Sequence, residues 1–381
     1  MTTCLRCGRT NRSIARFCID CNTSLPGAVP EPDAEDAEFA EPGETRQEST
    51  TLAFGLAGAF TQTLVDPAAE RRTRPTDHAL PEGTMIEGFR IVRTIGEGGF
   101  GIVYLAWDAA LERHVAIKEY MPSSLAVRSD AQYSVSVRSE RYRDTFDAGL
   151  RSFVNEARLL ARFDHPALVK VLRFWEANRT AYMAMPWYEG PTLKQTLAEL
   201  KGRSTDEQLR AWLHPLLDAL AVIHQENCFH RDISPDNILL TATGPVLLDF
   251  GAARRAINDM TQAMTAVLKP GFAPIEQYGG DMLQGPWTDL YALGGVVHYA
   301  ITGRPPPASV LRAVEDKLEP LSASHAGRFS RDLLAAVDNA LAVRPEARPQ
   351  DVAAFRAMLG APSPLPRASG TMVRPGAVAA D

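Results

Sequence analysis

Residues 230–240 read His-Arg-Asp-Ile-Ser-Pro-Asp-Asn-Ile-Leu-Leu, and after a short turn residues 246–251 read Val-Leu-Leu-Asp-Phe-Gly. Asp232 and Asn237 precede an apolar run typical of a buried strand, and Asp249 ends a second such run. If the two strands are neighbours, all three polar side chains reach one edge. An amide and a carboxylate there suit Mg²⁺ on a nucleotide, and a second carboxylate suits acceptance of a hydroxyl proton. The alternative is a buried polar network in another kind of α/β enzyme.

Composition indicates an ordinary water-soluble protein of 381 residues, 45% of them hydrophobic and 23% charged. A formal net charge of −6 argues against a general nucleic-acid binder. Eight of the acidic residues fall within positions 31–48, against one arginine, so the rest of the chain is nearly neutral. The longest uncharged run, residues 49–65, is too short and too polar for a bilayer span, and no signal peptide is recognised. We therefore expect a cytoplasmic protein without membrane contact.

Four cysteines form a pattern of their own near the start, at Cys4, Cys7, Cys18 and Cys21. Two C-x-x-C pairs predict one tetrahedral Zn²⁺ held by four thiolates, which is a structural and not a catalytic site. Residues 1–25 resemble the zinc ribbons of bacterial regulatory proteins, and so small a unit would need the metal to fold. Disulfides are the alternative, but they require an oxidising compartment.

Two further segments are expected to be disordered. Residues 26–85 are acidic and rich in Ala, Gly and Pro, which predicts a linker. Residues 361–381 contain four prolines and are expected to be a disordered tail. Threonines in the linker would be accessible to phosphorylation, and a forkhead-associated domain could then bind them as a partner. Unmodified linker threonines are an equally good interpretation.

A glycine-rich loop precedes a strand-like run in the middle of the chain. Residues 96–101 read Gly-Glu-Gly-Gly-Phe-Gly and continue into Ile-Val-Tyr-Leu, so we expect strand, turn and strand where a dinucleotide-binding fold would open a helix. Glycines let backbone N–H groups approach phosphates closely. Fourteen residues after Tyr104, the run Val-Ala-Ile-Lys ends with Lys118, a single cation on an apolar strand.

A lysine in such a position needs a fixed anion, and a helix follows that offers one. Glu156 lies on the same predicted face as Phe153 and can point inward toward Lys118. The apolar residues at helical spacing are Phe146, Leu150, Phe153, Ala157 and Leu160. Between Lys118 and this helix, Tyr133, Val135 and Val137 alternate as in a strand, which predicts an additional hairpin of unassigned role.

In this order, these motifs resemble those of the eukaryotic-type serine/threonine protein kinases of bacteria. The resemblance covers residues 86–360 and implies an α+β, bilobal kinase fold with a β-rich small lobe and a helical large lobe. It implies ATP and Mg²⁺ as cofactors, protein serines and threonines as substrates, autophosphorylation and a role in signal transduction. The rival interpretation is a pseudokinase that binds nucleotide and recruits partners through the zinc ribbon. A nucleic-acid-binding role for the basic ribbon is a weaker alternative.

The resemblance also assigns roles to individual residues. Lys118, fixed by Glu156, would hold the α- and β-phosphates, and Asp232 would accept the substrate proton. Asn237 and Asp249 would bind Mg²⁺. The nucleotide-binding residues implied are Ile95, Gly96, Gly98, Gly101, Val103, Ala116, Lys118, Met185, Pro186, Tyr188 and Leu239. Among these, Met185 matches the gatekeeper position, and the Pro186 carbonyl and Tyr188 amide would face the adenine edge.

The segment after residue 251 matches a kinase activation segment. Thr261 and Thr265 are the candidate phosphorylation sites. Glu276 is expected to form an ion pair with Arg348, and Asp289 is expected to hold the backbone of the catalytic loop.

Two departures from the kinase pattern occur together. Family members usually carry Lys two residues after the catalytic Asp and Thr shortly before the A-P-E motif. Here the first position is Ser234 and the second, counted back from Glu276, is Lys269. We therefore list Lys269 among the catalytic residues, as a cation that faces the γ-phosphoryl group from the opposite wall. The alternatives are that Lys269 is an exposed loop residue and that Ser234 marks a slow or inactive enzyme.

Overall fold

The computed structural model describes residues 2–3, 10–11, 78–129, 133–251, 268–279 and 282–360. The chain divides into two compact units, residues 1–53 and 54–381. In the first unit, β1 (Thr2–Thr3) pairs antiparallel with β2 (Thr10–Asn11). Several sequence predictions fall outside the described residues: the cysteines Cys4, Cys7, Cys18 and Cys21, most of the linker, Thr261, Thr265 and the tail 361–381.

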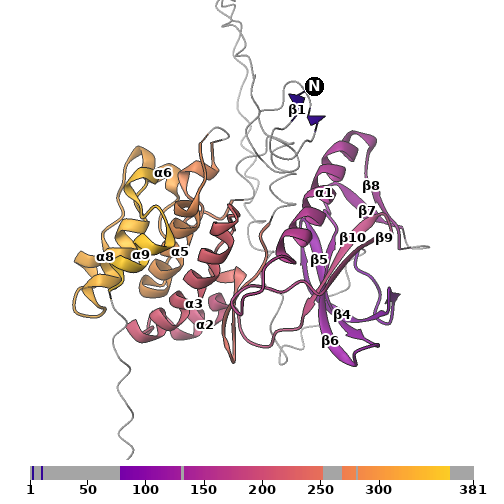
Figure 1. Ribbon diagram of the computed structural model, residues 1–381, viewed down its shortest axis with the longest axis horizontal. Coiled ribbons are helices and arrows are strands. Elements are labelled where there is room, and N and C mark those ends of the chain that lie inside the picture. Colours follow the sequence, from indigo (N-terminus) through magenta and orange to yellow (C-terminus); the bar gives the residue numbers. More distant parts are fainter. Residues whose placement is uncertain are drawn as a thin grey trace, which may run out of the picture. The chain divides into compact units, whose positions relative to one another are not determined.

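The small lobe of the second unit is a six-stranded antiparallel sheet in the order β3-β4-β5-β6-β10-β9 (Figure 1). Its strands are β3 (Met85–Ile86), β4 (Phe89–Gly98), β5 (Gly101–Asp108), β6 (Arg113–Tyr120), β9 (Arg173–Ala177) and β10 (Thr180–Pro186). Gly98 pairs with Gly101, so the glycine-rich loop is the turn between β4 and β5, as predicted. A Cβ on Gly101 would lie 2.4 Å from the Glu119 carbonyl oxygen, so only glycine fits against β6 there.

One long helix and one added hairpin complete the small lobe. Helix α1 (Arg143–Leu160) follows a short 3₁₀ turn (Glu140–Tyr142) and contacts β10. Its buried residues include Phe146, Phe153, Ala157 and Leu160, the face that helical spacing predicted. The strands β7 (Ala126–Arg128) and β8 (Val135–Val137) pair antiparallel. The additional hairpin expected between Lys118 and the helix is therefore present.

The large lobe is helical apart from one hairpin (Figure 1). Its helices are α2 (Leu193–Leu200), α3 (Asp206–Gln225), α5 (Pro286–Thr302), α6 (Ser309–Val314), α7 (Leu321–Ser324), α8 (Arg331–Ala340) and α9 (Val352–Met358), with 3₁₀ turns at Pro235–Asn237, Ile275–Gln277 and Pro345–Ala347. Thr205 and Gln208 form a capping box that starts α3, because each satisfies a backbone N–H of the first turn. Helix α5 is buried along most of its length and packs against α3, α8 and α9.

The hairpin in the large lobe places the polar residues that the sequence singled out. Strand β11 (Ile238–Thr241) pairs antiparallel with β12 (Gly244–Leu247), with Ile238 opposite Leu247. Asn237 immediately precedes the first strand, and Leu248 donates its backbone N–H to the Asn237 carbonyl at 2.8 Å. The predicted neighbouring strands are thus confirmed. Within the described ranges, no helix is long and apolar enough to cross a bilayer.

Candidate active site

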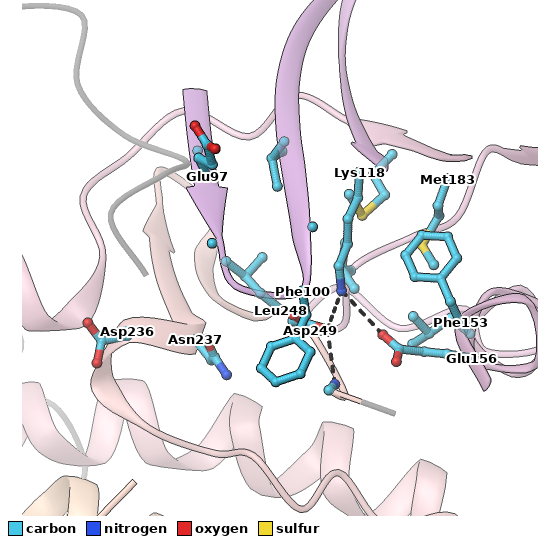
Figure 2. Close-up of a pocket in the computed structure, with 18 of the residues that line it drawn as sticks. Glu97, Phe100, Lys118, Phe153, Glu156, Met183, Asp236, Asn237, Leu248 and Asp249 are labelled. Atoms are coloured by element: carbon cyan, nitrogen blue, oxygen red, sulfur yellow. Dashed lines mark hydrogen bonds and ion pairs between the residues drawn. The ribbon is translucent and has the colours of Figure 1, made fainter. Parts of the chain in front are cut away.

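A lysine from β6 contacts two carboxylates from different parts of the second unit. Lys118 Nζ lies 3.6 Å from Glu156 Oε1 on α1 and forms a closer ion pair with Asp249 Oδ1, just after β12. Figure 2 shows the Lys118 side chain reaching toward both acids. The Nζ atom also lies 5.6 Å from the centre of the Phe153 ring, within cation–π range. The pairing expected of Lys118 and Glu156 is therefore present.

Asp249 is held in its charged form. Burial disfavours the carboxylate, but the charge and hydrogen bond of Lys118 outweigh this and hold the pKa of Asp249 well below its usual range. The Gly251 backbone N–H also donates to Asp249 Oδ1, at 3.0 Å. Asp249 is thus an anion at neutral pH, as a ligand for a cation must be.

Asp232 and Asn237 contact each other through their side chains. Asn237 Nδ2 donates to Asp232 Oδ2 at 2.7 Å and to the Asp232 carbonyl at 2.8 Å. Both residues are buried, with 9% and 5% of their surface exposed. The first bond orients the Asp232 carboxylate, and the second ties the Asn237 side chain to the backbone across the four residues that separate the two positions.

The backbone just before Asp232 is fixed by a fully buried acid on α5. Asp289 accepts the backbone N–H groups of His230 at 2.9 Å and Arg231 at 2.7 Å, and its Oδ2 also lies 2.8 Å from His224 Nε2. Burial raises the pKa of Asp289, but the contacts with His224 and the amides bring it below its ordinary value. Arg231 has φ = 64°, an unusual conformation for a residue with a side chain. The predicted role of Asp289 in holding this backbone is confirmed.

A second predicted ion pair ties together distant parts of the large lobe. Arg348 Nη1 and Nη2 donate to Glu276 Oε1 and Oε2 at 2.7 and 3.1 Å, and both side chains have 0% exposure. Thr288 Oγ1 donates to the same Glu276 at 2.9 Å. The two-pronged geometry suits a guanidinium and a carboxylate, and it places the end of the activation segment against α5.

Lys269 lies close to the catalytic loop. Its Nζ donates to Ser234 Oγ at 2.7 Å and lies 3.9 Å from Asp232 Oδ1. The Lys269 side chain is 20% exposed. The structure therefore brings Lys269 and Ser234 together, and the interpretation of Lys269 as an exposed loop residue is wrong.

A cavity lies between the glycine-rich loop and the segments that flank the β11–β12 hairpin. The predicted residues that line it are Gly96, Gly98, Gly101, Val103, Lys118, Glu156, Met185, Asn237 and Asp249. Five residues predicted to bind nucleotide are absent from this lining: Ile95, Ala116, Pro186, Tyr188 and Leu239. Ala116 pairs with Met185 across β6 and β10 and has 1% of its surface exposed. Leu239 has 0% exposure and belongs to the core.

Sequence reasoning missed other residues that line the cavity, namely Glu97, Phe100, Phe153, Leu160, Val169, Met183, Thr192, Asp236, Leu248 and Gly251. Phe100 could have been found from its place inside the glycine-rich loop. Met183 could have been found from the alternation of β10, since it pairs with Lys118 and lies two residues before Met185. Val169 and Thr192 come from loops that carry no local signal.

The donors at the inner end of the cavity fit Mg²⁺ on a bound nucleotide. Asn237 and Asp249 both line the cavity, and the Asn237 amide nitrogen is engaged by Asp232, so the amide oxygen is the atom left to bind a cation. Oxygen donors of this kind suit Mg²⁺, which commonly uses few protein ligands and completes its shell with phosphate and water.

Comparison with known proteins gives consistent results. A family model described as a protein kinase domain matches residues 89–358. Serine/threonine-protein kinase PknB of Mycobacterium tuberculosis is 33% identical over 286 residues, 71% of this chain and 42% of the relative. Serine/threonine-protein kinase PknA of Nostoc sp. is 29% identical over 277 residues, 68% of this chain and 44% of the relative. The chain thus spans less than half the length of these curated relatives.

A solved structure is more similar than either of these relatives. The structure titled PpkA-294 apo form is 52% identical, with a TM-score of 0.70, and the match covers 74% of this chain and 99% of that one. A crystal structure of the Mycobacterium tuberculosis PknI kinase domain, at 23% identity and a TM-score of 0.53, shares the fold.

Proposed function

Because this chain belongs to the protein kinase family, we propose that it is a serine/threonine kinase that transfers the γ-phosphoryl group of ATP to proteins, itself included. One observation carries the proposal: Lys118, Glu156 and Asp249 line one cavity, and Asp232 is hydrogen-bonded to Asn237, which lines it too. Lys118 contacts Glu156 and Asp249, and Asp232 is oriented by Asn237. A scaffold that only bound nucleotide would have no need of an oriented Asp232.

Lys118 contributes by binding and orienting the nucleotide. Its ammonium group, positioned by the buried Glu156, would neutralise the α- and β-phosphates and place them under the glycine-rich loop. Mg²⁺, held by Asn237 and Asp249, would supply charge neutralisation at the phosphates when bound. Positioning and charge stabilisation are the main sources of rate in such a transfer.

Asp232 contributes at the hydroxyl of the substrate. Its carboxylate, which accepts a hydrogen bond from Asn237 Nδ2, would orient the serine or threonine hydroxyl and accept its proton as the new bond to phosphorus forms. The backbone that carries Asp232 is fixed in turn by Asp289, so little reorganisation is needed at the moment of transfer.

The direct test compares the unchanged chain with Asp232→Asn, using Mg-ATP and a mixture of serine- and threonine-containing peptides. We expect the variant to retain nucleotide binding and to lose turnover by about 10²- to 10⁴-fold, the usual contribution of a positioned base. Equal phosphate incorporation by the two proteins would contradict the kinase proposal and favour the binding scaffold.

We further propose that Thr261 and Thr265 are autophosphorylated, with linker threonines as additional sites that a forkhead-associated partner would bind. Arg231 directly precedes the catalytic residue Asp232, and its guanidinium could therefore pair with a phosphate added to the activation segment. Mass-spectrometric mapping after incubation with Mg-ATP tests this. The expected result is phosphate at these positions in the unchanged chain and none in Asp232→Asn.

We also propose that the protein is cytoplasmic. The cysteine spacing supports a further proposal, that each chain binds one structural Zn²⁺ through Cys4, Cys7, Cys18 and Cys21. Metal analysis of the purified protein should give one zinc per chain, and Cys4→Ser/Cys7→Ser should give none. Peptide kinase activity should survive in that variant, because the zinc unit would serve localisation or choice of partner.

A further inference from the structure

The large-lobe wall of the site carries a lysine whose position is set by its neighbours. Lys269 Nζ donates to Ser234 Oγ at 2.7 Å, and Ser234 is fully buried. The distance of 3.9 Å to Asp232 Oδ1 is within ion-pair range but too long for a direct hydrogen bond. The ammonium group is thus anchored on the serine and only loosely paired with the carboxylate that would receive the substrate proton.

The backbone around Lys269 is anchored as well. The Lys269 carbonyl accepts the N–H groups of Phe272 at 3.1 Å and Ala273 at 3.0 Å, and Ser309 Oγ donates to the Ala273 carbonyl at 2.8 Å. Gly271 has φ = 87°, and a Cβ there would lie 2.5 Å from the Pro306 carbonyl oxygen. This turn therefore requires glycine and fixes the direction in which Lys269 leaves the backbone.

Phosphoryl transfer at Asp232 requires a cation near the γ-phosphoryl group, and Lys269 can supply it. Lys118 approaches from the small lobe and is shared between Glu156 and Asp249. During transfer, negative charge is spread over the oxygens of the γ-phosphoryl group, and a cation already in place stabilises it most effectively. Ser234 is uncharged, so it cannot supply that stabilisation from the catalytic loop.

We propose that Lys269 is a catalytic residue that contacts the γ-phosphoryl group during transfer, and that Ser234 is the positioning residue that holds it. The inference rests on the proposed kinase function. The substrate oxygen forms a bond to the γ-phosphorus as the bond from that phosphorus to the β,γ-bridging oxygen breaks. The proton passes to Asp232, and ADP leaves with the electron pair of the broken bond. Lys269 stays protonated throughout and interacts with the equatorial oxygens.

The experiment measures kcat, KM and nucleotide affinity in the full chain for three variants: Lys269→Ala, Lys269→Thr, and Lys269→Thr combined with Ser234→Lys. Lys269→Ala should lower kcat about 10²-fold, as loss of a charge-stabilising donor does, and leave the Kd for Mg-ATP within a few-fold. The combined variant returns a cation to the site from the catalytic loop and should be at least about ten-fold faster than Lys269→Thr alone. Lys317→Ala, which removes a surface lysine that is 74% exposed, is the matched control.

A second readout does not depend on turnover. Binding of ADP, Mg²⁺ and aluminium fluoride, a mimic of the transferring phosphoryl group, should weaken about 10²-fold in Lys269→Ala, and binding of ADP alone should be unchanged. If the unchanged chain fails to turn over but shows this dependence, the kinase proposal fails, whereas the contact of Lys269 with the position of the γ-phosphoryl group stands.

Three results would overturn the assignment. The first is turnover of Lys269→Ala within about three-fold of the unchanged chain, with unaltered affinity for the fluoride complex. The second is a loss that lies wholly in Mg-ATP affinity, with kcat unchanged. The third is a combined variant that is no faster than Lys269→Thr although thermal unfolding shows it to be as stably folded.

Discussion

The two lobes each contain a buried arginine–glutamate pair, and the two pairs are built differently. In the large lobe, Arg348 donates hydrogen bonds to Glu276 from two nitrogens. Its Nε and Nη2 also donate to the carbonyls of Ala342 and Val343, at 2.7 Å each. In the small lobe, Arg128 reaches Glu119 with Nη2 alone, at 2.5 Å. The large-lobe guanidinium therefore links its partner Glu276 to the nearby carbonyls of Ala342 and Val343.

The small-lobe arginine uses its other nitrogens elsewhere. Arg128 Nε donates to the carbonyl of His78 and Nη1 to that of Tyr133, both at 2.7 Å. Tyr104 Oη donates to Glu119 Oε2, the oxygen that Arg128 also contacts. Burial raises the pKa of Tyr104, so this hydroxyl stays protonated and can donate. Arg128 thus links the added hairpin and the start of the folded domain to β6, the strand of Lys118.

The difference shows two uses of one interaction. A buried ion pair is weak support for net stability, because desolvation offsets much of the attraction, but losing one partner is expensive. In the large lobe such a pair holds segments that the kinase pattern shares. In the small lobe it incorporates an insertion, since the guanidinium of Arg128 on β7 binds the carbonyls of His78 and of Tyr133, which lies in the loop between β7 and β8.

The largest effect is expected from Arg348→Ala. Glu276 has 0% exposure, and removing its partner leaves a buried charge, which typically costs about 3–5 kcal/mol. Urea unfolding should show this loss in the free energy of unfolding. Arg356→Ala, which removes a partly exposed partner of Asp218, is the control and should cost under about 1 kcal/mol. If Arg348→Ala were as stable as this control, the Arg348–Glu276 pair would not be what holds these segments of the large lobe together.

A smaller loss, about 2–3 kcal/mol, is expected for Arg128→Met, because the Tyr104 hydroxyl still donates to Glu119. The distinguishing readout is local: limited proteolysis should become faster around residue 78 and the loop at Tyr133, whose carbonyls lose their donor. Arg128→Lys should not restore protection, since an ammonium cannot span three separate acceptors with the geometry of a planar guanidinium. An unchanged rate of proteolysis would show that the Arg128–Glu119 pair does not hold the inserted hairpin in place.

Asp289 extends the comparison to a buried acid held by His224 and backbone amides. Its pKa lies below the ordinary value, so the stability it adds is fully present above about pH 4 and is lost as the pH falls through the folded-state pKa. Asp289→Asn should cost about 2 kcal/mol at pH 7, the size of hydrogen bonds to a charged group. The difference in the free energy of unfolding between Asp289→Asn and the unchanged chain should become smaller when urea unfolding is repeated at lower pH, down to pH 3. A difference that stayed constant would mean that the charge of Asp289 is not what stabilises the loop.

The smallest effect is expected from Tyr104→Phe. The hydroxyl donates to Glu119 at 2.7 Å and accepts the Leu80 N–H at 3.1 Å, so its loss removes two bonds but leaves Arg128 in place. We expect a cost of about 1 kcal/mol in thermal or urea unfolding. Tyr133→Phe, which removes the hydroxyl of an exposed side chain, serves as the control. A cost above that of Arg128→Met would make Tyr104 the principal partner of Glu119.

The sequence by itself determined the parts whose signal is local. The strand of Lys118, the face of α1 that carries Glu156 and the loop from Asp232 to Asn237 follow from periodicity and short spacing, because neighbours along the chain decide which side chains share a face. The family order of the motifs added the pairing of Glu276 with Arg348, 72 positions apart. The nucleotide contacts implied for Ile95, Ala116, Pro186, Tyr188 and Leu239 stay predictions, since matching a motif does not say which side chains line the cavity.

Only the tertiary structure decided contacts between segments with no shared pattern. Arg128 binds residues that lie 50 and nine positions before it in the chain, and no periodicity in the sequence indicates that it would be buried against Glu119. The sequence left Lys269 either in the site or in an exposed loop. The choice came from tertiary contacts: Lys269 Nζ donates to Ser234 Oγ and lies near Asp232 Oδ1, and the nearby Gly271 lies too close to the Pro306 carbonyl to carry a side chain. Long-range packing settles such positions because it fixes backbone direction, which residue type alone leaves open.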